Sequence, residues 1–212
     1  MVVHRCWRDR SYCSSLVRLL FNQINMPDVI VIAGPNGAGK STLAPALLRD
    51  TLRIPEYVNA DTIAEGLSAF APEDASFHAG RVMLGRLHEL AEARKDFAFE
   101  TTLASRFYAG WLKQLQAQGY RVSIIFLWLP VVELAIKRVE TRVQSGGHSI
   151  PEETIRRRFD RGLRNLFALY LQVANSWRVF NSSQYPPQEI ARYTEDSGML
   201  IFEDQTWNQI KR

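Results

Sequence analysis

The 212-residue chain has no long hydrophobic run, and this absence narrows what the protein can be. Its longest apolar stretch, VSIIFLWLPVV at residues 122–132, is much shorter than the roughly 18–20 residues that a membrane-spanning helix needs. Pro130 also interrupts that stretch, so a buried strand is the better interpretation. We therefore expect no membrane association, and the length favours one globular domain with one core.

Cysteine is scarce as well, and both examples, Cys6 and Cys13, lie among the first 25 residues. Their spacing matches no metal site, and the sequence gives no sign of a disulfide framework. A body without cysteine is compatible with the reducing cytosol, so we predict a cytoplasmic location. Residues 1–25 are rich in arginine and serine, as a transit peptide would be, but we expect a flexible extension or an upstream start before Met26. The folded domain is then expected at residues 26–212.

A strong charge of one sign is missing from most of the chain. The formal net charge is +4, but residues 1–25 carry +3 of it and leave only +1 for the rest. A nucleic-acid-binding domain would need a basic patch or stripe across its body. We therefore predict no nucleic-acid partner.

What the chain does contain is a regular alternation of apolar runs and helical segments. This order is typical of an α/β protein with a mostly parallel five-stranded sheet, helices on both faces and three layers. The last long helix is expected at about residues 151–176, and residues 191–204 resemble a hairpin that turns at Asp196–Gly198. The predicted strands are residues 28–33, 56–60, 97–100, 121–129 and 177–182.

The segment GPNGAGKST at residues 34–42 is a complete phosphate-binding loop of the Walker A pattern, placed between a strand and a helix. Glycines in such a loop let backbone N–H groups face phosphates, and the helix N-terminus adds a favourable dipole. Lys40 is expected to reach the β- and γ-phosphates of ATP, while the Ser41 hydroxyl is expected to hold Mg²⁺. The predicted nucleotide-binding residues of the loop are Gly34, Pro35, Asn36, Gly37, Ala38, Gly39, Lys40, Ser41 and Thr42.

The loop alone does not say whether the terminal phosphate goes to water or to another molecule. An ATP-binding-cassette ATPase would carry an apolar strand ending in Asp-Glu soon after its signature loop. The segment QSGGH at residues 144–148 resembles such a signature, but a basic amphipathic helix pattern follows it. Because no apolar run in the chain ends in Asp-Glu, we reject the cassette interpretation.

A kinase needs instead a base for the acceptor hydroxyl, an acceptor pocket and cations that neutralise the transferred phosphoryl group. Asp61 follows the second strand, where open α/β sheets bind ligands, and its carboxylate could act as the base or cap the next helix. Glu100 closes the third strand and is a candidate for substrate binding or for contact with Mg²⁺-bound water. Basic residues from Lys137 to Arg164 flank a glycine-containing loop and predict an arginine-rich lid.

Several ordered blocks of the sequence together resemble the zeta toxin family of P-loop kinases, in its free-standing chromosomal branch. Within about residues 27–210 these blocks are IAGPNGAGKST, VNADTIA, AGRVML, FAFETTLASR, GYRVSIIFLWLP and RVETRVQSGGHSIPEETIRRRF. The resemblance implies ATP- and Mg²⁺-dependent phosphorylation of a sugar hydroxyl on a UDP-activated amino sugar, typically UDP-N-acetylglucosamine. An antitoxin protein is a further possible partner that the chain itself does not reveal.

The resemblance also implies roles for individual residues. It implies that Lys40 is the phosphate-loop lysine, that Asp61 is the catalytic base and that Arg138 is the first phosphate-binding arginine. It places His148 where the toxins have a second arginine. Alternative sources of that second positive charge are Arg157 and Arg158.

Two other functions stay open beside the one that the resemblance implies. One is a kinase for another small metabolite on the same scaffold. The other is a nucleotide-dependent switch whose slow hydrolysis of ATP is incidental. The resemblance to the zeta toxin family further implies that three residues face the substrate, namely Glu100, Thr102 and Arg81.

Overall fold

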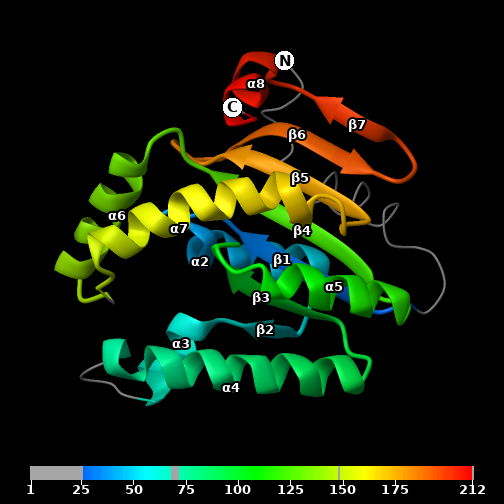
Figure 1. The fold of residues 1–212 in the computed structure, drawn as a ribbon, viewed down its shortest axis with the longest axis horizontal. Helices are drawn as coiled ribbons and strands as arrows, with labels where there is room; N and C mark the ends of the chain where they lie inside the picture. Colours follow the sequence, from blue (N-terminus) through cyan, green and yellow to red (C-terminus); the bar gives the residue numbers. More distant parts are fainter. Residues whose placement is uncertain (1–25, 68–71, 148, 212) are drawn as a thin grey trace.

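The order of the strands in one sheet determines where the functional residues meet. The computed structural model describes residues 26–67, 72–147 and 149–211, and the predicted extension at residues 1–25 lies outside them. Within these ranges the strand order is β2-β3-β1-β4-β5-β6-β7 (Figure 1). The strands are β1 (Asp28–Ala33), β2 (Glu56–Val58), β3 (Phe97–Thr101), β4 (Arg121–Trp128), β5 (Ser176–Asn181), β6 (Gln188–Thr194) and β7 (Gly198–Ile201).

The predicted α/β architecture is confirmed, but the predicted size of the sheet is wrong. Strands β1 to β5 run parallel, whereas β6 and β7 extend the same sheet in antiparallel register, so the described residues form a seven-stranded mixed sheet. β6 and β7 are the predicted hairpin, which turns between Thr194 and Gly198. The hairpin joins the sheet because Ile190 and Ala191 of β6 are fully buried in the same core as Trp207 of helix α8.

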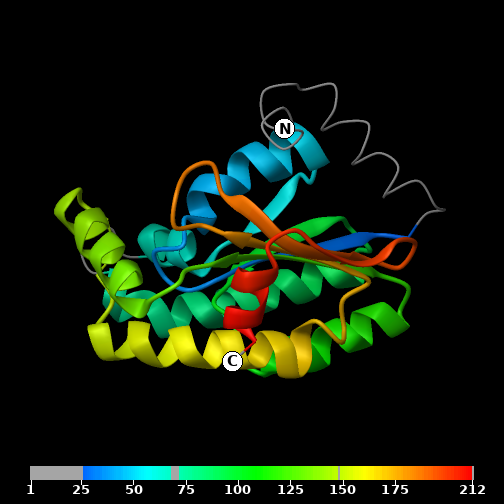
Figure 2. The same ribbon diagram turned by 90° about the horizontal axis from the view of Figure 1, so that it is seen from above.

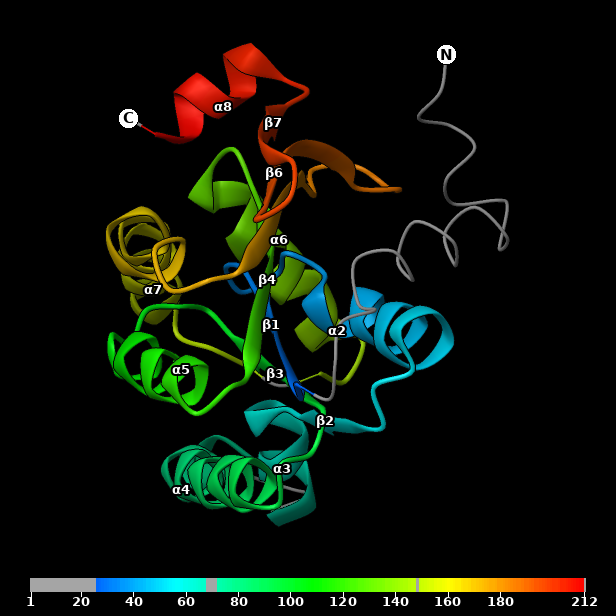
Figure 3. The same cartoon turned by 90° about the vertical axis from the view of Figure 1, so that its right-hand side faces the viewer.

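Helices cover both faces of the sheet, as predicted. α5 and α7 lie on one side and α2 on the other, and α4 lies beyond the β2 edge (Figure 2, Figure 3). No helix within the described residues is both long and apolar enough to cross a lipid bilayer. The helices, with π-helical segments labelled η, are α2 (Lys40–Ala44), η2 (Pro45–Leu52), α3 (Ala60–Leu67), α4 (Pro72–Glu92), α5 (Phe107–Ala117), α6 (Val132–Gln144), α7 (Glu152–Asn165), η3 (Leu166–Tyr170) and α8 (Asp204–Ile210).

The helix predicted at residues 151–176 is too long at its C-terminal end. In the structure α7 and η3 together end at Tyr170. Asn175 already pairs with β4: its backbone N–H donates to the Val122 carbonyl, and its side-chain oxygen accepts from the Val122 N–H. These bonds turn the chain into β5, so the last predicted helical turn belongs to the loop and the strand.

Alternate residues of β1 enter apolar cores on opposite faces of the sheet. Val29, Val31 and Ala33 pack in the core that contains residues of α4 and α5, whereas Ile30 and Ile32 pack in the core that contains residues of α6. Full burial of one such side chain stabilises the fold by about 1.5–3 kcal/mol. β1 therefore provides a firm base for the loop that follows it.

Helix α7 is fixed against the loop that follows β3. Gly162 is buried so close to this loop that a Cβ atom there would lie 2.2 Å from the Thr102 carbonyl oxygen. Asn165 Nδ2 donates to two loop carbonyls, at 2.8 Å and 3.2 Å, and the Tyr170 hydroxyl donates to a third. The accepting carbonyls belong to Leu103, Ala104 and Ser105, respectively. We call this set of contacts the α7 clamp.

Gly162→Ala should destabilise the protein by about 1–3 kcal/mol, because the added methyl group would overlap a backbone oxygen of the clamped loop. Urea unfolding would measure the change. Gly110→Ala is the matched control, since a Cβ at this α5 position meets no atom within 4 Å and alanine favours a helix over glycine. Equal unfolding midpoints for the two variants would show that the close packing of Gly162 in the α7 clamp does not stabilise the protein.

Candidate active site

The phosphate loop connects β1 to α2 and is held by contacts on two sides. Gly37 has a φ of 75°, and a Cβ atom there would lie 2.6 Å from the Ala135 carbonyl oxygen of α6. Only glycine suits both the backbone angle and the close approach. On the other side, the Ser182 hydroxyl beyond β5 donates to the Ala38 carbonyl over 2.6 Å. The loop is therefore packed against α6 on one side and hydrogen-bonded to the segment after β5 on the other.

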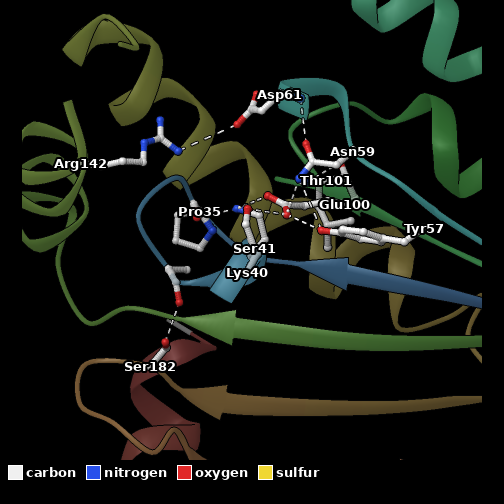
Figure 4. A network of polar contacts seen from close by, with 12 residues as sticks. Pro35, Lys40, Ser41, Tyr57, Asn59, Asp61, Glu100, Thr101, Arg142 and Ser182 are labelled. Carbon is white, nitrogen blue, oxygen red and sulfur yellow. Dashed lines mark hydrogen bonds and ion pairs between the residues drawn. The ribbon is translucent and has the colours of Figure 1, made fainter. Parts of the chain in front are cut away.

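Lys40 lies inside this loop with a side chain that is only 5% exposed. Its Nζ donates to the Pro35 carbonyl at 2.9 Å and lies 3.5 Å from Oε1 of Glu100 (Figure 4). Burial lowers the pKa of Lys40 from its ordinary value, while the Glu100 carboxylate acts in the opposite direction. The carboxylate thus helps to keep the lysine charged in a position that suits the β- and γ-phosphates of a nucleotide.

Glu100, on β3, accepts hydrogen bonds at Oε2 from three side chains of the described residues. The donors are the Ser41 hydroxyl at 3.0 Å, the Tyr57 hydroxyl at 2.7 Å and Asn59 Nδ2 at 2.9 Å (Figure 4). The parallel pairing of β1 with β3, which sets Ile32 opposite Glu100, brings this acid beside the phosphate loop. Of the two roles that the sequence leaves open for Glu100, the bond to Ser41 favours contact with Mg²⁺-bound water.

Asp61 lies in the first turn of α3, and its carboxylate does not cap the helix. The Asp61 backbone N–H donates to Oδ1 of Asn59 at 2.8 Å, and α3 begins at Ala60. Asn59 is therefore the capping residue, and the interpretation in which Asp61 caps a helix beginning at residue 62 is wrong. Asp61 Oδ2 lies 4.0 Å from a guanidinium nitrogen of Arg142 on α6 (Figure 4). The predicted base thus faces a cation across the edge of the sheet.

Arg138, which is predicted to bind phosphate, braces the phosphate loop in this structure. Its Nη1 donates to the Ser182 carbonyl at 2.8 Å and to the Gly37 carbonyl at 3.4 Å. Its Nη2 donates to the Ser183 carbonyl at 2.8 Å. Arg138 therefore lies at the phosphate loop, where its guanidinium N–H groups bind backbone carbonyls. The contact of Arg138 with a phosphate stays a prediction.

The arginines predicted on the lid, Arg157 and Arg158, lie in the middle of α7 and line a cavity beside the loop that follows β3. Burial lowers the pKa of Arg158, and the negative charge of Asp61 opposes this effect. Thr102 belongs to the same region, since its carbonyl is the group that touches Gly162. The cavity and Thr102 thus lie together where α7 packs against the loop after β3.

None of the hydrogen bonds, ion pairs or ring contacts among the described residues joins Arg81 to this group. Arg81 is exposed on α4, and its guanidinium carbon lies 5.5 Å from the centre of the Phe77 ring. This is the contact of a helix-surface arginine. His148, which is predicted to occupy the position of the second arginine, lies outside the described residues.

The side chains around Ser41 fit a Mg²⁺ ion that is bound mainly by a nucleotide and water. Mg²⁺ usually takes one or two protein oxygens, while phosphates and waters complete its octahedron. The Ser41 hydroxyl donates a hydrogen bond to Glu100 Oε2, 3.0 Å away. The lone pairs of its oxygen are then free to face a metal ion. The described residues contain no group of three or more His, Cys, Asp or Glu side chains that could hold a metal alone.

The sequence does not single out Tyr57, Asn59 and Ser182, and it marks Arg142 only as one of the basic residues of the lid. The structure places all four in the site. Tyr57 and Asn59 are two residues apart, a spacing that puts side chains on one face of a strand. Arg142 follows Arg138 by four residues, which puts them on one face of α6. Ser182 is far from the loop in sequence, and no local pattern marks it.

Tyr57→Phe should weaken Mg²⁺–ATP binding by about five- to tenfold, because it removes one hydrogen bond that orients the Glu100 carboxylate. Burial, and then the neighbouring carboxylate, raise the pKa of Tyr57, so its hydroxyl stays protonated and acts as a donor. Calorimetric titration with Mg²⁺–ATP measures the effect. Tyr108→Phe is the matched control, because the Tyr108 hydroxyl contacts Met83 away from the loop; equal affinities would contradict the role of Tyr57.

The strand order, the phosphate loop and the helices on both faces together define a P-loop kinase-like α/β fold. Residues 17–185 match the family model described as "Zeta toxin". Because this match covers more than half of the chain, the protein belongs to the zeta toxin family. β6, β7 and α8 follow the matched segment.

Known proteins resemble the chain in sequence and in structure. An uncharacterised protein of Haemophilus influenzae is 31% identical over 130 residues, which are 61% of this chain and 91% of that protein. The AvrRxo1-ORF1:-ORF2 structure with ATP matches with a TM-score of 0.72 and 14% identity, covering 95% of this chain and 68% of that one. The PezAT chromosomal toxin–antitoxin system of Streptococcus pneumoniae matches with a TM-score of 0.60 and 14% identity, covering 92% of this chain and 84% of that one. At these identities the structural matches support the fold.

Proposed function

We propose that the protein is an ATP-dependent kinase that transfers the γ-phosphate to a hydroxyl group of a small molecule. The observation that carries this proposal is the Asp61 carboxylate, which is released from capping by Asn59 and stands across from Arg142 beside a braced phosphate loop. A hydrolase would need only to orient water, whereas a base on the acceptor side of the loop suits a hydroxyl acceptor. Membership of the zeta toxin family supports the same reaction.

In this proposal each side chain has a separate task. Lys40 neutralises the phosphates, and Glu100 keeps it charged and orients the Ser41 hydroxyl. Asp61 accepts the proton of the attacking acceptor hydroxyl, and Arg142 stabilises the ionised carboxylate before transfer. Arg138 holds the loop against the segment after β5, which keeps the phosphates in line with the acceptor.

A Mg²⁺ ion bound with ATP would be held by Ser41, with Glu100 contacting its water ligands. When bound, the ion would supply positive charge to the β- and γ-phosphate oxygens. The structurally similar AvrRxo1 complex is described with ATP, which supports ATP as the nucleotide of this chain.

The acceptor that we propose is the amino sugar of a UDP-activated sugar, UDP-N-acetylglucosamine first among them. This choice rests on the family. We also propose an antitoxin protein as a partner, because the similar PezAT structure is described as a toxin–antitoxin system.

Incubation with Mg²⁺–ATP and a panel of UDP-sugars, read by mass spectrometry, tests this acceptor class. UDP-N-acetylglucosamine should give a product that is heavier by one phosphate group. If no UDP-sugar gains that mass while another metabolite does, the kinase proposal stands and the acceptor class is wrong. If no acceptor on a broad metabolite panel gains it, the kinase proposal itself fails.

A further inference from the structure

β7 forms an outer edge of the sheet and leaves apolar side chains exposed (Figure 1, Figure 3). Among the described residues it pairs with β6 on one side and with no strand on the other. It carries neither the lysine nor the proline that often protects such an edge from pairing with another extended chain. The exposed large apolar residues on β7 and directly after it are Met199, Leu200 and Phe202.

Acidic side chains lie at both ends of β7. Glu195 and Asp196 are in the turn that precedes the strand, and Glu203 and Asp204 follow it. In the part of the chain that the structure describes, no cation forms an ion pair with any of these carboxylates. Because opposite charges stabilise neighbouring strands, this edge favours a positively charged partner strand.

A second copy of the chain does not suit this edge. If two β7 strands paired antiparallel about their centres, Glu195 of one copy would lie beside Asp204 of the other. Asp196 would likewise lie beside Glu203. Like charges that are directly opposite destabilise a strand pair, so the charges favour a basic extended segment over a copy of β7.

Residues 1–16, which lie outside the described ranges, have the composition of such a segment. They carry Arg5, Arg8 and Arg10 against Asp9 alone. They contain no proline or glycine, and their valines, tryptophan and tyrosine favour strands. They precede the part of the chain that matches the zeta toxin family, whereas β7 follows that part. The segment and the edge are thus both additions to the matched core.

The chain before β1 leaves the sheet at the end from which β7 can be reached. β1, β4 and β5 run parallel, and Ser176 at the start of β5 pairs with Thr194, so Met26 lies at the same end of the sheet as the turn before Gly198. β7 is four strands away from β1, which is about 19 Å at the usual strand spacing. Residues 17–25 can span at most about 30 Å. A strand that leads from the β7 edge to Met26 runs in the direction opposite to β7.

We infer that residues 1–16 add an antiparallel strand to the outer edge of β7, where their arginines meet the acids at its two ends. The backbone groups of β7 that point away from β6 gain hydrogen-bond partners in this arrangement. The added strand also covers an edge that would otherwise be open to other chains. The inference concerns a surface four strands away from the strand that carries the phosphate loop, so it does not depend on the proposed function.

Thiol cross-linking of the full chain tests which segment occupies the edge, because Cys6 and Cys13 are the only cysteines of the sequence. With Cys13→Ser as the background, Leu200→Cys and a short bifunctional maleimide should link most molecules to Cys6 within one chain. Val82→Cys is the matched control, since Val82 is 40% exposed and Leu200 is 38% exposed, but Val82 lies on α4. This control should give no such link.

The products of the cross-linking decide between the occupants when they are mapped by mass spectrometry at low protein concentration. Equal linkage within one chain in the Leu200→Cys and Val82→Cys proteins, or linkage in neither, would overturn the inference. A link that joins two chains through Leu200→Cys would assign the edge to a second copy and would also overturn it. Thermal unfolding shows whether the variants fold like the unaltered protein.

Hydrogen exchange of the full chain, followed by mass spectrometry, tests the added strand itself. A variant that combines Arg5→Glu, Arg8→Glu and Arg10→Glu should exchange its β7 amides at least about fivefold faster, because the segment would then meet the acids with like charge. β2, at the other edge of the sheet, is the internal control and should exchange equally in both proteins. Unchanged exchange of β7 would show that residues 1–16 do not pair with it.

Discussion

Asp61→Asn should lower kcat by about 10²- to 10⁴-fold and leave ATP binding intact, because general base catalysis typically contributes that much. Asparagine keeps the shape of the side chain but cannot accept the proton of the acceptor hydroxyl. The helix should not suffer, since Asn59 caps α3 and the Asp61 side chain has no part in the cap. Single-turnover phosphotransfer and equilibrium ATP binding, measured on the same preparation, check the two halves of this expectation.

Glu65→Gln provides the matched control for Asp61→Asn. Glu65 is an exposed acid on the same helix α3, so its neutralisation removes an equal charge from the same element. We expect its kcat to stay within about twofold of that of the unaltered protein. Unchanged turnover in Asp61→Asn would remove Asp61 as the base, and equal losses in both variants would assign the effect to net charge.

Glu100→Ala should destabilise the nucleotide-free protein by about 3 kcal/mol or more and also abolish phosphotransfer. The side chains of Lys40 and Glu100 are 5% and 10% exposed, so loss of the carboxylate leaves a buried ammonium group without its counter-charge. The donors on Ser41, Tyr57 and Asn59 lose their shared acceptor at the same time. Urea unfolding in the absence of nucleotide measures the first effect.

Glu89→Ala is the control for this second expectation, because Glu89 also pairs with a cation but at the surface. Its partner Arg86 lies 3.2 Å away, and both side chains are largely exposed. Such a pair contributes about 0–1 kcal/mol. If Glu89→Ala and Glu100→Ala lowered the free energy of unfolding equally, the buried network around Glu100 would contribute no more to stability than a surface ion pair.

The parts of the fold that the sequence predicts are those that local patterns encode. The apolar run of β1 and the glycine loop after it locate Lys40 and Ser41 without any structure. Asp61 and Glu100 are predictable as site residues because the carboxyl ends of parallel strands meet at one edge of a sheet. The sheet is larger than predicted because membership of β6 and β7 depends on burial of Ile190 and Ala191, which is a tertiary property.

The parts that could not be predicted depend on contacts between distant segments. Arg138 is the clearest example: the sequence indicates a cationic role, but its partners Ser182 and Ser183 lie beyond β5. Gly162 looks like an ordinary glycine in a helix until the Thr102 carbonyl is found against it. Neither contact leaves a periodic or spacing signal, so only the folded chain reveals them.

The central claim is that the γ-phosphate goes to an acceptor and not to water, and its most direct test follows that phosphate. The protein is incubated with Mg²⁺ and γ-labelled ATP, with and without UDP-N-acetylglucosamine, and the label and ADP are quantified together. We predict that the acceptor stimulates ADP formation and that one labelled phosphate appears in the acceptor for each ADP. Release of the label as inorganic phosphate, at a rate unchanged by this acceptor or by a broad metabolite panel, would contradict the account.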